Sequence, residues 1–140
     1  MKIYDISLPI QTSMTAWPGD PQVELKTLSS IEQGDHSNVT QIKMSVHTGT
    51  HIDAPHHFIN SGDTVDQIPL RKMIGKVFVM IIDDDVDVIS DQVLELHPDF
   101  QSLKQASKVL FRTRNATLWR SHAKTFQIDY VGINTSGAAL

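Results

Sequence analysis

The segment 37–53 constrains the fold most, because its apolar and polar side chains alternate with a period of two. Side chains two residues apart lie on the same face of a strand. We therefore expect a strand with one apolar face turned to a core and one polar face. The apolar face would carry Ile42, Met44, Val46 and Ile52. The last residues of the polar face would be His47, Gly49, His51 and Asp53.

Two histidines four residues apart in a straight strand are too far apart to share one ion. Their separation is roughly 13 Å at ~3.3 Å per residue, whereas an imidazole nitrogen binds zinc at about 2.0–2.1 Å. Glycine within a strand often marks a bend or bulge. We expect Gly49 to bend the chain and bring His47 towards His51 and Asp53. Pro55 then turns the chain so that His57 faces the same cavity.

The side-chain types at these positions indicate a metal site. Neutral imidazole and carboxylate without thiolate suit Zn²⁺, then Mn²⁺ or Fe²⁺. Three protein ligands leave a coordination position for water, which is typical of catalytic rather than structural sites. His57 would then move protons. The alternative is a polar strand face with solvent-exposed histidines, and the pattern alone leaves these two interpretations about even.

The whole chain has 140 residues, a length that fits one domain. We expect a strand at 2–10, a second at 22–30, and buried strands at 76–83 and 107–113, the former with both faces covered. A turn at 16–22 separates the first two. Ser90 is expected to cap a short helix and Asn134 or Thr135 another, which begins just before the sequence ends.

Composition excludes several classes of protein. The absence of cysteine excludes disulfides and thiolate zinc sites. A net charge of −4 with no run of Lys or Arg argues against a nucleic-acid partner. No apolar run approaches the ~20 residues of a membrane helix, and Asp5 interrupts any signal-peptide segment. The sequence therefore predicts a soluble, cytoplasmic protein without a membrane partner.

The histidine-rich stretch also carries a family signature. "HTGTHIDAPHHF" resembles the pattern H-x-G-T-H-x-D-x-P-x-H of the cyclase family of metal-dependent hydrolases, which includes bacterial kynurenine formamidase and isatin hydrolase. "YDISLPIQTSMTAWPGDP", "VFVMIID" and "VLFRT" are similar to further segments of that family, so the resemblance spans a single domain at 1–140. The fixed positions are met by His47, Gly49, Thr50, His51, Asp53, Pro55 and His57.

The resemblance implies a fold, a site and a reaction. The residues matching His47, His51 and Asp53 bind a divalent metal, most often zinc and otherwise manganese, and the Asp53 position can bridge to a second ion. His57 acts in proton transfer, and Trp17 helps to wall the substrate pocket. The implied fold is α/β, of the swivelling β/β/α type with a mixed, mostly buried sheet, in a dimer or tetramer. The implied reaction is hydrolysis of a small-molecule amide, such as the formamide of N-formylkynurenine.

The sequence departs from the family at its C-terminal end. The family continues past the position of Leu140 with a strand, a His and a Glu that complete the second metal site. We therefore expect a C-terminally truncated chain whose second metal site cannot be assumed. The alternative function is an inactive family member that only binds metal or a partner subunit.

The remaining candidates have mostly structural interpretations. His56 is expected in a supporting or surface position. Arg112–Asn115 stays open between binding a substrate carboxylate and forming the exit from a strand. The acidic run 83–87 fits a solvated turn better than a calcium loop, and Ser136 lacks the surroundings of a nucleophile elbow. His36 is expected in a loop, and solvent exposure is expected for His97 and His122.

Overall fold

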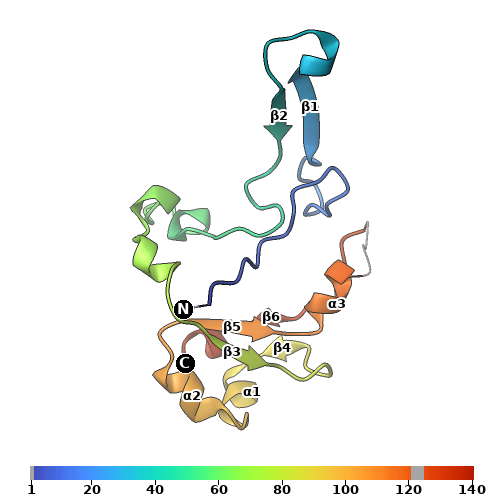
Figure 1. The fold of residues 1–140 in the computed structure, drawn as a ribbon. Coiled ribbons are helices and arrows are strands. Elements are labelled where there is room, and N and C mark those ends of the chain that lie inside the picture. The colour runs from blue at the N-terminus through green and yellow to red at the C-terminus, as the bar shows by residue number, and fades with distance from the viewer. Residues whose placement is uncertain (1, 121–124) are drawn as a thin grey trace. The chain divides into compact units, whose positions relative to one another are not determined.

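The computed structural model describes residues 2–120 and 125–140, and these form two compact units. The first unit holds residues 2–67 with 125–126, and the second holds residues 68–120 with 127–140. Each has its own strands, which are labelled in Figure 1. The position of His122 lies outside the described residues.

A two-stranded hairpin is the regular part of the first unit (Figure 1). β1 (Glu24–Ser29) pairs antiparallel with β2 (Val39–Lys43), and the 3-10 helix Ile31–Gln33 lies in the connection. The apolar pair Leu25 and Ile42 is directly cross-strand, yet their side chains are 41% and 54% exposed. An isolated hairpin is marginally stable in water, so this hairpin gains little from burial of its own strands.

The predicted strand at 2–10 is wrong, because this segment has no regular secondary structure. A strand forms only when a neighbouring strand accepts and donates its backbone hydrogen bonds, and no described segment pairs with it. The predicted turn after it is confirmed: the amide of Asp20 donates to the carbonyl of Trp17 at 2.9 Å. With Pro18 second and Gly19 third at φ +95°, this is a type II turn.

The expected long strand over 37–53 is also wrong in its second half. β2 ends at Lys43, and residues 47–50 form turns and bends. Short 3-10 helices follow at Pro55–His57 and Val65–Gln67. The residues expected at the end of the polar strand face, from His47 to Asp53, therefore lie in a loop.

The second unit contains two parallel strand pairs and four short helices. β3 (Phe78–Ile81) pairs with β5 (Val109–Arg112), and β4 (Val88–Ile89) pairs with β6 (Gly132–Ile133). The predicted α/β class is thus confirmed, with antiparallel and parallel strands divided among three small sheets. The helices are α1 (Asp91–Glu95), α2 (Phe100–Gln105), α3 (Asn115–Arg120) and α4 (Thr135–Ala138), with a 3-10 helix at Leu70–Lys72.

The core of the second unit lies between the β3–β5 sheet and helices α1 and α2 (Figure 1). Met80 and Leu94 are its most deeply buried large side chains, at 0% and 2% exposure. Burial on both faces was expected for β3, but Val79 and Ile81 are 51% and 53% exposed. The helices α1 and α2 cover one face of the sheet, so alternate residues of β3 stay accessible. The buried cluster is Met80, Ile82, Ile89, Leu94 and Val131.

Both predicted helix caps are confirmed. The hydroxyl of Ser90 accepts a hydrogen bond from the amide of Val93 at 3.3 Å. The side-chain oxygen of Asn134 accepts one from the amide of Gly137 at 2.9 Å. Such caps satisfy amides that have no partner within the helix. The sequence did not predict α2, or the two-residue strands β4 and β6.

Candidate metal centre

The signature histidines lie in a loop of the first unit that follows β2, here called the metal loop (residues 45–53). It begins with a local contact, in which the amide of His47 donates to the hydroxyl of Ser45 at 3.2 Å. Gly49 then takes a left-handed conformation with φ +69°, which residues with a Cβ rarely adopt. The bend expected at Gly49 is therefore present, as a loop turn instead of a bulge within a strand.

The metal loop brings three possible metal ligands together, two imidazoles and one carboxylate. His47 Nδ1 lies 2.9 Å from Asp53 Oδ1, and His51 Nε2 lies 3.6 Å from the same oxygen. One ligand atom from each residue lies within 4.8 Å of the others. The two imidazole rings meet edge to face with centroids 5.4 Å apart. All three side chains remain partly accessible, so an ion and a small molecule can reach them.

Hydrogen bonding decides which nitrogen His51 can offer. His51 Nδ1 lies 3.0 Å from the carbonyl oxygen of Gly49. A carbonyl only accepts, so Nδ1 carries the proton and Nε2 holds the lone pair on the side of Asp53. His47 donates from Nδ1 to the Asp53 carboxylate, and this nitrogen must lose its proton before it can bind a metal.

The arrangement fits a divalent cation. Two ligand atoms at about 2.1 Å from a tetrahedral ion lie about 3.4 Å from each other. The two distances to Asp53 Oδ1, 2.9 and 3.6 Å, lie on either side of that value. Imidazole nitrogen with carboxylate oxygen is a donor set for zinc and manganese. His47, His51 and Asp53 could therefore hold such an ion with small side-chain adjustments.

His57 lies beside this cluster, at the end of the 3-10 helix Pro55–His57. Its ring centroid is 3.9 Å from that of His47, with the planes tilted by 32°. Trp17 belongs to the type II turn and packs edge to face on Phe126, with centroids 4.7 Å apart. The structure thus gathers four of the five predicted site residues, and gives Trp17 an aromatic neighbour that the sequence did not indicate.

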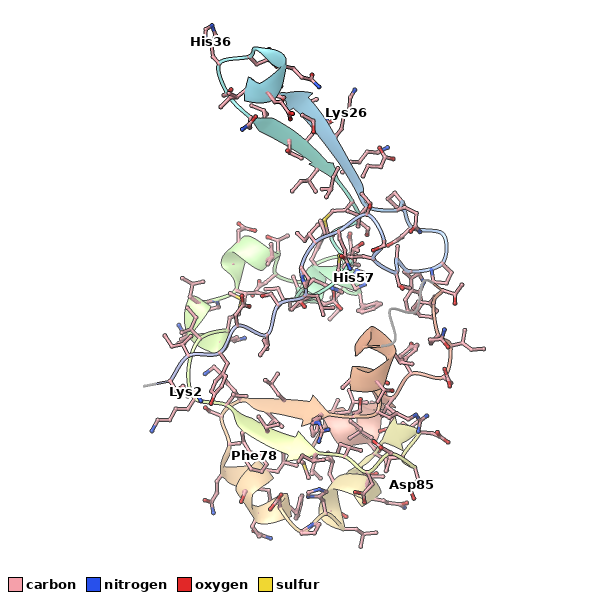
Figure 2. The ribbon with its side chains drawn as sticks, turned by 45° about the vertical axis from the view of Figure 1, so that its right-hand side comes forward. Lys2, Lys26, His36, His57, Phe78 and Asp85 are labelled. Carbon is pink, nitrogen blue, oxygen red and sulfur yellow. The ribbon has the colours of Figure 1, made fainter. Side chains whose placement is uncertain are left out.

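The other histidines differ in their surroundings. His36 lies exposed at the tip of the hairpin, whereas His57 lies near its base (Figure 2). His56 is exposed, and its amide donates to the carbonyl of Asp63. The expected exposure of His97 is wrong. Its ring is half-buried, with Nε2 donating to the Ile81 carbonyl at 2.9 Å and Nδ1 accepting from the Asp99 amide at 3.0 Å.

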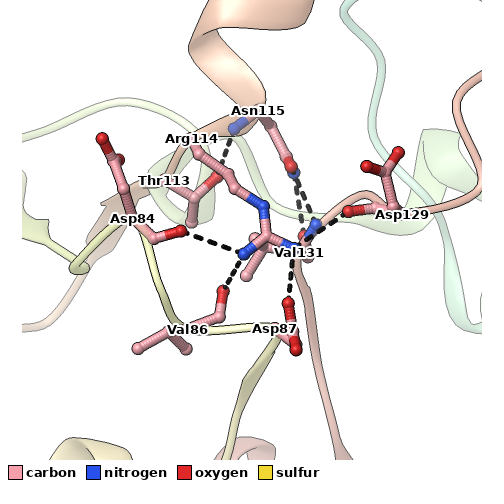
Figure 3. Close-up of polar contacts among 8 residues, drawn as sticks. All are labelled: Asp84, Val86, Asp87, Thr113, Arg114, Asn115, Asp129 and Val131. Atoms are coloured by element: carbon pink, nitrogen blue, oxygen red, sulfur yellow. Dashed lines mark hydrogen bonds and ion pairs between the residues drawn. The ribbon is translucent and has the colours of Figure 1, made fainter.

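Arg114, left open by the sequence, has a structural role in the second unit (Figure 3). Its guanidinium donates to the carbonyls of Asp84, Val86 and Asp129, and to the carboxylate of Asp87. Four acceptors occupy its planar donor fork, so it is not free to bind a substrate carboxylate. The acidic turn predicted at 83–87 is therefore held by one arginine that follows β5.

Asn115 adds a second set of bonds beside Arg114 (Figure 3). Its side chain donates to the carbonyl of Val131 and accepts from the amide of the same residue, both at 2.8 Å. These two bonds fasten the residues before β6 to the start of α3. The pair Arg114 and Asn115 therefore organises loops of the second unit.

Comparison with known proteins identifies the family. Residues 4–140 match the model of the family described as "Putative cyclase". The chain belongs to the cyclase family. This agrees with the signature residues that form the metal loop.

Known members resemble this cyclase-family chain over much of its length. It is 31% identical to cyclase-like protein 1 of Arabidopsis thaliana, over 98% of this chain and 55% of that protein. It is 32% identical to a kynurenine formamidase of Bacillus anthracis, over 80% of this chain and 51% of that enzyme. A solved structure of a "potential metal-dependent hydrolase with cyclase activity" superposes with a TM-score of 0.65 at 29% identity, over 98% of this chain and 60% of the other.

This cyclase-family chain spans about half the length of the curated relatives it matches. Among its described residues, no helix has the length and apolar character needed to cross a membrane.

Proposed function

We propose that this chain is part of a metal-dependent hydrolase that cleaves an amide bond of a small molecule, in the manner of an arylformamidase. One observation carries the proposal: His47, His51 and Asp53 each offer a ligand atom, and these three atoms lie within 4.8 Å of one another in a loop that bears the family signature. Kynurenine formamidase among the relatives supports the choice of amide. The proposal includes a homo-oligomer in the cytoplasm.

The metal, which we propose to be zinc or otherwise manganese, supplies carbonyl polarisation and a lowered pKa for water when it is bound. The protein's part is to present and orient the ligands. Gly49 accepts the Nδ1 proton of His51 and so keeps Nε2 available. Asp53 contributes the negative charge that both imidazoles face.

His57 is proposed as the group that moves protons. Its ring stacks at 3.9 Å on that of His47, so it lies next to the ligand cluster. A neutral imidazole there can take a proton from water and return it to the leaving nitrogen. Trp17, which packs edge to face with Phe126, is proposed as a wall that contacts the substrate's apolar part.

A second function depends on the metal loop alone. The ligand cluster forms from His47, His51 and Asp53 by themselves, so the alternative proposal is that this chain binds a metal ion or a partner subunit without catalysis. The chain would then bind the metal ion without hydrolysing a substrate.

The test is to measure bound metal by mass spectrometry and hydrolysis of N-formylkynurenine by the full chain. We expect about one ion per metal loop, lost in His51→Ala. We expect His57→Ala to keep the ion and lose turnover, because it removes the proton carrier and no ligand. Turnover by a metal-free His51→Ala variant would contradict the hydrolase proposal, and stoichiometric metal without any turnover would favour the second function.

A further inference from the structure

The segment 2–16, here called the N-terminal segment, has no helix or strand, yet it is buried at selected points. Ile3 and Ile6 are 80% and 63% exposed, whereas Met14 and Ala16 are 5% and 8% exposed. Burial in an irregular segment shows where it packs. Two contacts join this segment to the metal loop, and both fall between His47 and His51.

The first contact is between Met14 and Gly49. A Cβ built on Gly49 would lie 2.5 Å from Met14 Cε and 3.7 Å from its sulfur. The thioether therefore packs on the backbone of Gly49, in space that any other residue at this position would fill. Methionine suits such a site because its flexible chain fills irregular gaps.

The second contact is between Leu8 and Thr50. The Leu8 amide donates to the hydroxyl of Thr50 at 2.9 Å. This bond fixes the residue that directly precedes His51. Since this bond is exposed to water, it contributes less than the buried packing of Met14.

These contacts reach the metal ligands through Gly49. Its carbonyl accepts the Nδ1 proton of His51, and this bond directs Nε2 towards Asp53. A shift of the Gly49 backbone would therefore turn the His51 ring. Met14, which limits where that backbone can lie, acts on the ligand without touching it.

We propose that Met14 and Thr50 are positioning residues through which the N-terminal segment holds the metal loop in its ligand-gathering shape. The inference rests on the proposed metal site and adds that affinity for the metal depends on residues outside the signature's ligands. Groups that orient metal ligands typically change affinity by about 10–100-fold when removed.

The experiment measures Zn²⁺ affinity of the full chain by competition with a chromophoric chelator, with circular dichroism as the check on folding. Met14→Ala is expected to weaken binding roughly ten-fold, while Met14→Leu, which keeps the volume, stays within about two-fold. Thr50→Val is expected to lower the Zn²⁺ affinity about three- to five-fold. Thr50→Ser, which keeps the hydroxyl that accepts from the Leu8 amide, is expected to bind Zn²⁺ as the parent chain does. The visible spectrum of the Co²⁺ form should shift in Met14→Ala and Thr50→Val and not in their controls.

A double-mutant cycle tests the contact itself. Gly49→Ala introduces a Cβ that meets Met14 Cε, so part of its cost is steric. In the Met14→Ala background that part disappears, and Gly49→Ala should cost several-fold less in Zn²⁺ affinity. Additive effects would refute the packing argument.

The outcomes separate this inference from the proposed function. A parent chain that binds Zn²⁺ while Met14→Ala and Thr50→Val bind it equally well overturns the positioning roles and leaves the metal site intact. A parent chain that binds no metal overturns both. Should Met14→Ala fail to fold, the comparison of Thr50→Val with Thr50→Ser decides.

Discussion

Replacing Arg114 tests whether one side chain holds the acidic turn of the second unit. Three of its four acceptors are carbonyls, those of Asp84, Val86 and Asp129, at 3.0, 2.9 and 3.1 Å. The fourth is Asp87 Oδ1 at 2.7 Å, on a side chain that is 83% exposed. Each carbonyl bond contributes about 0.5–1.5 kcal/mol, and the exposed ion pair contributes about 0.5 kcal/mol. Arg114→Ala should therefore lower the free energy of unfolding by about 2–5 kcal/mol.

The controls separate carbonyl binding from charge. Asp87→Asn removes the ion pair alone and should cost about 0.5 kcal/mol. Arg114→Lys keeps the charge without the planar fork, so it should cost about 1–2 kcal/mol. Urea unfolding followed by circular dichroism measures the free energies, and hydrogen exchange of the Val131 amide reports the adjoining bonds to Asn115. If Asp87→Asn cost as much as Arg114→Ala, the ion pair and not the carbonyl bonds would hold the turn.

Three smaller changes test other contacts. Thr48 is 4% exposed, and its hydroxyl has no hydrogen-bond partner among the described residues. Thr48→Val should therefore raise the free energy of unfolding by about 1 kcal/mol. A lower free energy of unfolding in urea would contradict this. Ser90→Ala removes the cap of α1 and should lower the free energy of unfolding by about 1 kcal/mol. Ser90→Asp keeps a side-chain acceptor and should not lower it in this way. The Ser136 hydroxyl donates to Asp91 at 2.8 Å and lowers the pKa of that carboxyl from its ordinary 3.8. Because the folded-state pKa is the lower one, this bond stabilises the fold above about pH 3.8 and ceases to do so as pH falls through the folded-state pKa. Ser136→Ala should raise the pKa of Asp91 in a carboxyl NMR titration, and an unchanged titration would exclude the hydrogen bond as its cause.

Features with local causes were predictable from the sequence. The caps at Ser90 and Asn134 depend on residues within three positions, and the turn at Pro18 and Gly19 depends on backbone preferences of those residues. The α/β class and the family signature were predictable for the same reason, since pattern and residue type carry them. The sequence also predicted that His47, His51 and Asp53 come together, although not that they do so in a loop after the end of β2.

Tertiary structure alone decided the features that depend on partners far along the chain. Residues 2–10 alternate as a strand would, but they pair with no strand in the described part of the chain, and the Leu8 amide donates to the Thr50 hydroxyl instead. The sequence left Arg114 open between binding a carboxylate and forming the exit from a strand, and only folding gave it carbonyl acceptors from three loop residues. The contact of Met14 with Gly49 joins positions 35 residues apart. Periodicity and propensity describe a residue and its neighbours, whereas hydrogen-bond partners and packing at such separations are set only when the whole chain has folded.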